Sequence, residues 1–189
     1  MTRPEAPTYD RTARALHWLV AALLAAQFIT ALLLPDIEMD TPTDTVISLH
    51  FSFGLVIALL MIVRLVHRRL HPVAVAPGEA PAWERSLARA THLLFYAVLI
   101  VGPFLGWAAA SAYSVPVRLL GLLELPALAP RKAAWALQAG DVHGLAMWVL
   151  LGLVGLHAAA ALYHHFVRRD DVLRRMLTAA RGTGVAKRS

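Results

Sequence analysis

Nine histidines are the residues of this 189-residue sequence whose chemistry most needs explaining. Four of them, His17, His50, His143 and His157, lie inside long apolar runs and away from the basic ends of those runs. An ionisable side chain in a membrane-like apolar segment is costly and usually marks a functional path. These four histidines are therefore the first candidates for a site that binds a metal or relays protons.

The spacing of two of the four fits a single helix. His143 and His157 are fourteen residues apart, which corresponds to about 3.9 turns and about 21 Å of α-helix. Both rings then leave one helix on nearly the same face, at two different depths. That helix would offer two stacked ligands.

The elements that must position these residues are four apolar runs, at about residues 15–34, 46–66, 87–110 and 142–167. A membrane-crossing helix needs about 20 apolar residues to cross a hydrocarbon core of about 30 Å, and each run is long enough. The first run exceeds the about 7–15 residues of a signal-peptide core, so we expect a retained helix. The sequence predicts an all-α integral membrane four-helix bundle, one domain over residues 1–189.

Composition supports this class and excludes others. Apolar residues make up 58% of the chain and charged residues 16%, against about 45–50% and about 25% in soluble domains. The net charge is +6, but the positive residues lie between and after the apolar runs, so we do not expect nucleic-acid binding. The absence of cysteine excludes disulfides, iron–sulfur clusters and covalent haem attachment.

The distribution of Lys and Arg predicts the orientation. Fifteen of the eighteen lie at the N-terminus, in the second connection or in the C-terminal tail. Because positive loops stay on the cytoplasmic side, both termini should be cytoplasmic. Residues 35–45 and 111–140 would then lie outside, the latter with a short interfacial helix around 131–137.

This topology pairs the four histidines. His17 and His157 should meet in the inner half of the membrane, and His50 and His143 in the outer half. Two neutral imidazoles that face one another across a helix bundle suit a six-coordinate haem iron, with the porphyrin between the helices. The alternative is that each histidine is a buried polar residue bonded to a neighbouring helix.

The remaining histidines allow other roles. Solvated or headgroup-level positions explain His67, His71, His164 and His165, while His92 could be a spare ligand, a quinone hydrogen-bond partner or an interfacial residue. The candidates for contacts to a quinone or to haem propionates are Arg14, Arg64, His92, His164 and His165.

An ordered set of short motifs resembles a known family, the prokaryotic cytochromes b561. The stretches are RALHW at 14–18, LH at 49–50, VR at 63–64, HLLFY at 92–96, GP at 102–103, DVH at 141–143, LHAAAA at 156–161, HHF at 164–166 and DDVLRRM at 170–176. The resemblance extends from about residue 9 to residue 177.

The resemblance implies a small four-helix protein of the bacterial inner membrane with two non-covalent b-type haems. By it, His17 and His157 would ligate the inner haem iron, and His50 and His143 the outer one. Members of this family pass electrons between quinone and a partner, and one activity in it is superoxide oxidation with ubiquinone reduction. The resemblance thus implies an electron-transfer oxidoreductase.

Two other functions stay open. Related cytochromes serve as the membrane anchor and electron relay of a dehydrogenase or hydrogenase, and a haem-free transporter could use the histidines as proton relays. For superoxide, Arg118, Arg131 and Lys132 are the basic residues expected on the outer side, where they would steer the anion. Alternatively, they neutralise Glu124, Asp141 and lipid phosphate.

Overall fold

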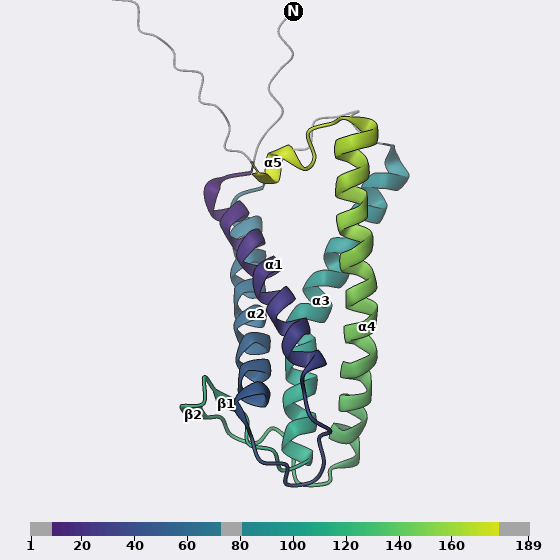
Figure 1. Cartoon of the computed structure of the whole chain (residues 1–189). Coiled ribbons are helices and arrows are strands. Elements are labelled where there is room, and N and C mark those ends of the chain that lie inside the picture. The colour runs from purple at the N-terminus through teal and green to yellow at the C-terminus, as the bar shows by residue number, and fades with distance from the viewer. Residues whose placement is uncertain (1–8, 73–80, 178–189) are drawn as a thin grey trace, which may run out of the picture.

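The computed structural model describes residues 9–72 and 81–177, and these residues are mostly helical. The long helices are α1 (Arg11–Leu32), α2 (Thr45–Leu70), α3 (Ala82–Ala112) and α4 (Ala134–Tyr163), and α4 continues into a π-helical turn, η1 (His164–Arg168). A short helix, α5 (Arg174–Leu177), follows (Figure 1). All four long helices are long and apolar enough to cross a membrane. The predicted four-helix membrane protein is therefore confirmed at the level of its helices.

Capping residues explain where the first two helices begin. The Asp10 side chain accepts a hydrogen bond from the Ala13 N–H at 2.7 Å, and Asp44 does the same for Ile47 at 2.8 Å. Each carboxylate pairs an N–H group that has no partner within its own helix. Both helices therefore begin directly after an aspartate.

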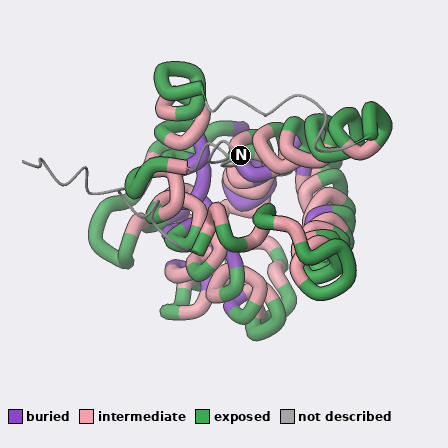
Figure 2. Tube along the Cα trace, turned by 90° about the horizontal axis from the view of Figure 1, so that it is seen from above, coloured by how far each residue is buried: buried purple, intermediate pink, exposed green. Residues whose placement is uncertain are grey.

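The helices pack in sequence order, with α2 between α1 and α3, and α3 against α4. The core contains Val20, Leu24, Ile57, Leu99 and Leu150, and Figure 2 shows buried segments toward the middle of the bundle with exposed ones around it. Large apolar side chains also cover the outside; Trp148, for example, is 69% exposed. An apolar outer face suits contact with lipid.

Two predicted features of the helix ends are wrong. No separate helix forms at 131–137, because α4 begins at Ala134 and runs through this segment without a break. Close packing holds that first part of α4 on α3, since a Cβ at Gly140 would lie 3.0 Å from the Cβ of Ala109. The first helix ends at Leu32 rather than residue 34, because Pro35 disfavours helical geometry in the residue before it.

A β-hairpin lies between α3 and α4 that the sequence analysis did not predict. Strands β1 (Arg118–Leu119) and β2 (Leu123–Glu124) pair in antiparallel fashion. The turn requires positive φ at Leu120 (52°) and Gly121 (71°). Ser52, a fully buried residue of α2, accepts a hydrogen bond from the Leu120 N–H at 2.7 Å. The hairpin is thus fixed to the end of α2 (Figure 1).

The beginning of α1 and the short helix α5 lie at the same end of the bundle (Figure 1). The Trp18 indole N–H donates to the main-chain oxygen of Met176 at 3.0 Å and joins the two segments. Two segments at the beginning and end of a chain lie at the same end of a bundle when an even number of long helices connects them. The four long helices satisfy this condition.

Candidate functional site

The four histidines from the apolar runs form two pairs at opposite ends of the bundle. The ring centroids of His17 on α1 and His157 on α4 are 6.3 Å apart. Those of His50 on α2 and His143 on α4 are 6.4 Å apart. The structure brings together the same residues that the topology argument paired.

These separations match two ligands that share one metal. With a metal–nitrogen bond of about 2 Å and about 1 Å more from nitrogen to ring centre, two imidazoles on opposite sides of a metal have centroids about 6 Å apart. In the described ranges no group of three or more His, Cys, Asp or Glu side chains is arranged to hold a metal ion. Two protein ligands per site suit an iron whose other four positions are filled by a porphyrin.

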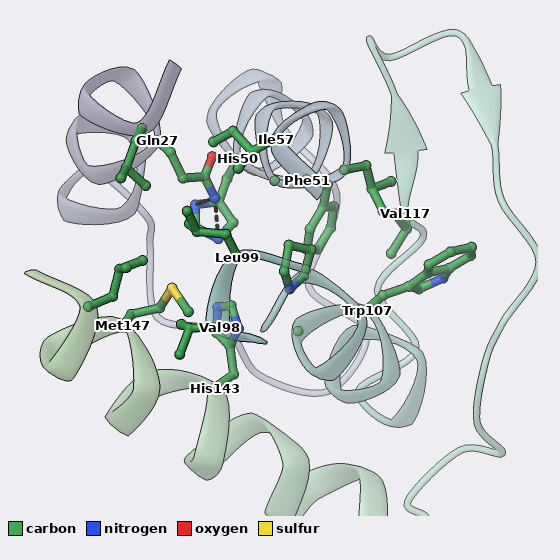
Figure 3. Close-up of a pocket in the computed structure, with 16 residues that line it drawn as sticks. Gln27, His50, Phe51, Ile57, Val98, Leu99, Trp107, Val117, His143 and Met147 are labelled. Atoms are coloured by element: carbon green, nitrogen blue, oxygen red, sulfur yellow. Dashed lines mark hydrogen bonds between the residues drawn. The ribbon is translucent and has the colours of Figure 1, made fainter. Parts of the chain in front are cut away.

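An apolar cavity surrounds the His50–His143 pair. Residues from all four long helices and Val117, just before the hairpin, line it, among them Gln27, Trp107 and Met147 (Figure 3). Most of this lining is hydrocarbon, as a porphyrin edge requires. The outer pair therefore lies in surroundings that suit haem.

The ring of His143 has one nitrogen already engaged. Its Nδ1 lies 2.9 Å from the main-chain oxygen of Gly102 on α3. An oxygen of this kind only accepts, so Nδ1 carries the proton and Nε2 keeps its lone pair. A histidine that ligates a metal commonly donates its other N–H to a carbonyl in this way.

Glycines bring α3 close to this ring. A Cβ at Gly106 would lie 3.2 Å from Cε1 of His143, and one at Gly102 would lie 2.9 Å from the terminal methyl of Met147. A side chain at Gly106 would push on the imidazole, whereas glycine leaves the ring its position. Helix α3 therefore shapes the site mainly through its backbone.

The inner pair has a third ring beside it. The centroid of His92 on α3 lies 5.8 Å from that of His157, so the structure places His92 at the inner pair. Phe95, also on α3, lies edge-on to His157 at 5.5 Å. His92 is thus a neighbour of the His17–His157 pair and could replace one of its members as a candidate ligand.

Two of the predicted arginines lie at this inner end. Arg64 donates from Nη1 to the main-chain oxygen of Ala13 at 3.0 Å, and Ala13 lies about one turn of α1 before His17. The Nε of Arg14 is buried and has no hydrogen-bond partner within the described part of the chain. Guanidinium groups so placed suit carboxylates such as haem propionates.

His164 and His165 lie apart from the pairs, in η1. His164 Nδ1 contacts Asp170 at 2.5 Å; burial of Asp170 raises the pKa of its carboxyl, but hydrogen bonds from His164 and the Val172 N–H outweigh burial and lower it. His165 stacks edge-on against Phe166 with centroids 4.8 Å apart. The structure therefore does not gather all the quinone and propionate candidates into one site.

His67 and His71 stack on each other at the other end of α2 from His50, with centroids 4.4 Å apart. His67 also lies 3.4 Å from the Asp10 carboxylate. Both rings are far along α2 from the outer pair and are explained by local contacts.

The basic residues predicted to steer an anion are largely paired with carboxylates. Arg118 bonds Glu124 at 3.1 Å, and Arg131 bonds both carboxylate oxygens of Asp40, one of them at 2.6 Å. The hydrogen bond from Arg131 holds the pKa of Asp40 below its usual value. Arg118 therefore neutralises Glu124, as the alternative interpretation predicted. Asp141 forms no ion pair with Arg118, Arg131 or Lys132 in the described structure.

Sequence reasoning missed one polar residue at the outer pair. Gln27 on α1 places Nε2 3.2 Å from Nδ1 and 3.3 Å from Nε2 of His50, as the dashed lines in Figure 3 mark. The available signal was a single amide in the middle of an otherwise apolar run.

Comparisons with known proteins find related sequences over nearly the whole chain. The prokaryotic cytochrome b561 family matches residues 8–179. Cytochrome b561 homolog 2 of Escherichia coli (strain K12) is 30% identical over 173 residues, 89% of this chain and 90% of that protein. Cytochrome b561 homolog 1 of the same strain is 28% identical over 174 residues, 89% of this chain and 96% of that protein. Probable superoxide oxidase CybB of Yersinia pestis is 28% identical over 168 residues, 88% of this chain and 94% of that protein.

Proposed function

The chain belongs to the prokaryotic cytochrome b561 family, and from this premise we propose that it is a di-haem b-type cytochrome that exchanges electrons with the quinone pool. One observation carries the proposal: two histidine pairs with centroids 6.3 and 6.4 Å apart. His17 and His157 would hold the inner haem iron, and His50 and His143 the outer one.

Each haem would supply one-electron redox chemistry, and the protein determines where the electron enters and leaves. His143 and His157 are fourteen residues apart on α4, about 21 Å along the axis. The apolar residues between them exclude water from the path. Two histidines would hold each haem, His17 with His157 and His50 with His143, and a haem held in this way would supply electron transfer rather than oxygenation.

Superoxide is the donor that we propose, with ubiquinone as acceptor. The basis is the 28% identity to a protein named probable superoxide oxidase CybB. Two superoxide anions would be oxidised to two molecules of oxygen, and the two electrons with two protons would reduce one quinone to quinol. Arg14, Arg64 and His92 support a polar site at the inner end, where a quinone headgroup or the propionates would bind.

We place the protein in the bacterial inner membrane with both termini in the cytoplasm. The support is the excess of Lys and Arg in the termini and in the second connection, which stay on the cytoplasmic side. The outer pair would then face the periplasm, where a donor arrives.

A difference spectrum of dithionite-reduced minus oxidised protein tests this function. We expect two b-type haems per chain in the detergent-purified protein and one in each of His50→Ala and His157→Ala. His71→Ala is the matched control, because His71 stacks on His67 and contacts the His67 main-chain oxygen at the other end of α2 from His50, and it should keep both haems. A well-folded colourless protein would reject the proposal and favour the histidine relay, and co-purification of a catalytic subunit would favour the anchor role.

A further inference from the structure

Gln27 has one buried atom that the structure leaves unpaired. Its Oε1 has no hydrogen-bond partner among the residues described, while its Nε2 faces both ring nitrogens of His50. The side chain lies in a cavity walled by apolar residues such as Ile57, Val98 and Leu99 (Figure 3). A polar atom without a partner in such surroundings is costly, so its presence calls for an explanation.

Ligation by His50 is incompatible with this orientation of the amide. If Nε2 of His50 binds a metal, Nδ1 must carry the proton and act as a donor. The amide NH2 of Gln27 is also a donor, and two donors cannot bond each other. Rotation of the amide by 180° about its last bond places Oε1 where the amide nitrogen lies, 3.2 Å from Nδ1 and 3.3 Å from Nε2 of His50. A small turn of the imidazole then directs Nδ1 to Oε1 and Nε2 away from it.

The partner ring already has the arrangement that this rotation would give His50. His143 donates from Nδ1 to the Gly102 oxygen at 2.9 Å, which leaves its Nε2 for a metal. His50 has no backbone oxygen in that role among its described contacts, and Gln27 is the polar side chain that reaches it.

We propose that Gln27 is a positioning residue of the outer pair: its Oε1 accepts the Nδ1–H of His50 and holds this ring with Nε2 toward His143. This proposal rests on the proposed function. An acceptor behind a ligating imidazole makes the ligand more basic and stabilises the oxidised metal relative to the reduced one. Gln27 thereby lowers the midpoint potential of the outer haem alone.

Neighbouring residues hold the backbone of Gln27 and leave its amide free to take either orientation. Thr30 donates from Oγ1 to the main-chain oxygen of Gln27 at 2.9 Å. Across the interface, a Cβ at Gly54 would lie 3.5 Å from the Gln27 amide nitrogen, which is an ordinary van der Waals contact. The two amide orientations fill the same space and differ only in the exchange of oxygen and nitrogen, so the hydrogen bond that His50 requires decides between them.

Redox titration of the purified holoprotein tests the proposal, with each haem followed by its absorbance and its low-spin electron paramagnetic resonance signal. The signals of the outer haem are assigned as those that are lost in His50→Ala. Gln27→Leu should raise the midpoint potential of that haem and change its resonance, while the inner haem stays unchanged. Gln27→Glu, which keeps an acceptor oxygen and loses the amide donors, should leave that potential at or below the wild-type value.

Gln138→Leu is the matched control, because Gln138 is an exposed residue on α4 and should leave both potentials unchanged. Unchanged potentials in Gln27→Leu at full haem content would overturn the proposal, as would shifts of the same sign in Gln27→Leu and Gln27→Glu. If Gln27→Leu loses the outer haem, retention in Gln27→Glu supports the acceptor role and loss in both overturns it. A wild-type protein without two haems would instead reject the proposed function itself.

Discussion

His143 on α4 donates from Nδ1 to the main-chain oxygen of Gly102 on α3, at 2.9 Å. The bond joins the most closely associated pair of helices and also leaves Nε2 as the ring nitrogen with a free lone pair. The packing of α3 against α4 and the orientation of the His143 ring therefore depend on the same hydrogen bond. A change that moves the ring by a few tenths of an ångström should affect the site before it affects the fold.

Gly106→Ala makes such a change. The new Cβ would lie 3.2 Å from Cε1 of His143, so the ring must shift against its bond to Gly102. Overpacking of this kind typically costs about 1–3 kcal/mol, which corresponds to about 5- to 150-fold weaker haem binding. We expect haem per chain to fall from two toward one, measured by the pyridine haemochrome assay.

Gly152→Ala is the control for this experiment. A Cβ at Gly152 meets nothing within 4 Å, and the residue lies nine positions from His143, on the opposite face of α4. The substitution adds the same methyl group and the same gain in helix propensity. Equal haem loss in both variants would contradict the steric explanation.

Ser52→Ala tests how the hairpin is attached. Ser52 Oγ accepts from the Leu120 N–H and donates to the Ser48 oxygen, both at 2.7 Å. Removing the hydroxyl leaves the Leu120 N–H without its partner, at a cost of about 1–3 kcal/mol. We expect a lower midpoint of thermal unfolding in detergent.

Ser48→Ala provides the comparison, because among the described residues Ser48 Oγ bonds just the Arg118 oxygen, at a longer 3.3 Å. Ser48→Ala should lower the midpoint of thermal unfolding less than Ser52→Ala does. If the two variants unfold at the same temperature, the buried bond to Leu120 does not fix the hairpin.

The sequence predicted the features that depend on the length of the apolar runs and on the helical spacing of residues. The four spans follow from apolar runs, and the two sites follow from His143 and His157 on one helix together with alternating helix direction. The hairpin was missed because its strands have two residues each and depend on Ser48 and Ser52, which are distant in sequence. Gln27 was missed because a lone amide has no motif, and its role depends on which helix faces it.

The bridge between Asp40 and Arg131 predicts a pH dependence of stability. Arg131 lowers the pKa of Asp40 from its ordinary 3.8, so the folded state binds this proton less readily than the unfolded state. The contribution is fully present above the ordinary pKa and is lost as the pH falls through the lowered one. Asp40→Asn should therefore unfold at a lower temperature than wild type at pH 7, with the difference vanishing in strong acid.

Asparagine is the appropriate replacement because residue 40 has a φ of 63°, which Asn tolerates. Asp36→Asn, in the same connection, controls for the loss of one exposed charge. A difference for Asp40→Asn that persists at low pH would show that something other than ionisation stabilises this connection.

On the face that we propose to be periplasmic, ion pairs would determine how superoxide is attracted. Because Arg118 is paired with Glu124, replacing both (Arg118→Gln with Glu124→Gln) leaves the net charge unchanged and should not alter the superoxide-driven rate. Lys132 forms no ion pair in the described structure, so Lys132→Gln removes a net positive charge. The full surface field can change association rates by about 10–10³-fold, and one charge should account for about twofold.

The measurement is the initial rate of ubiquinone reduction driven by a superoxide source, taken over a range of ionic strength. Lys132→Gln should lower the rate and flatten its salt dependence at unchanged haem content. The triple variant with Gln at positions 118, 131 and 132 should have a still lower rate and a still flatter salt dependence. Salt screens the attraction between exposed charges and an approaching anion, so a steering effect should be largest at low ionic strength. An unchanged rate in the triple variant at low ionic strength would show that these residues do not steer superoxide.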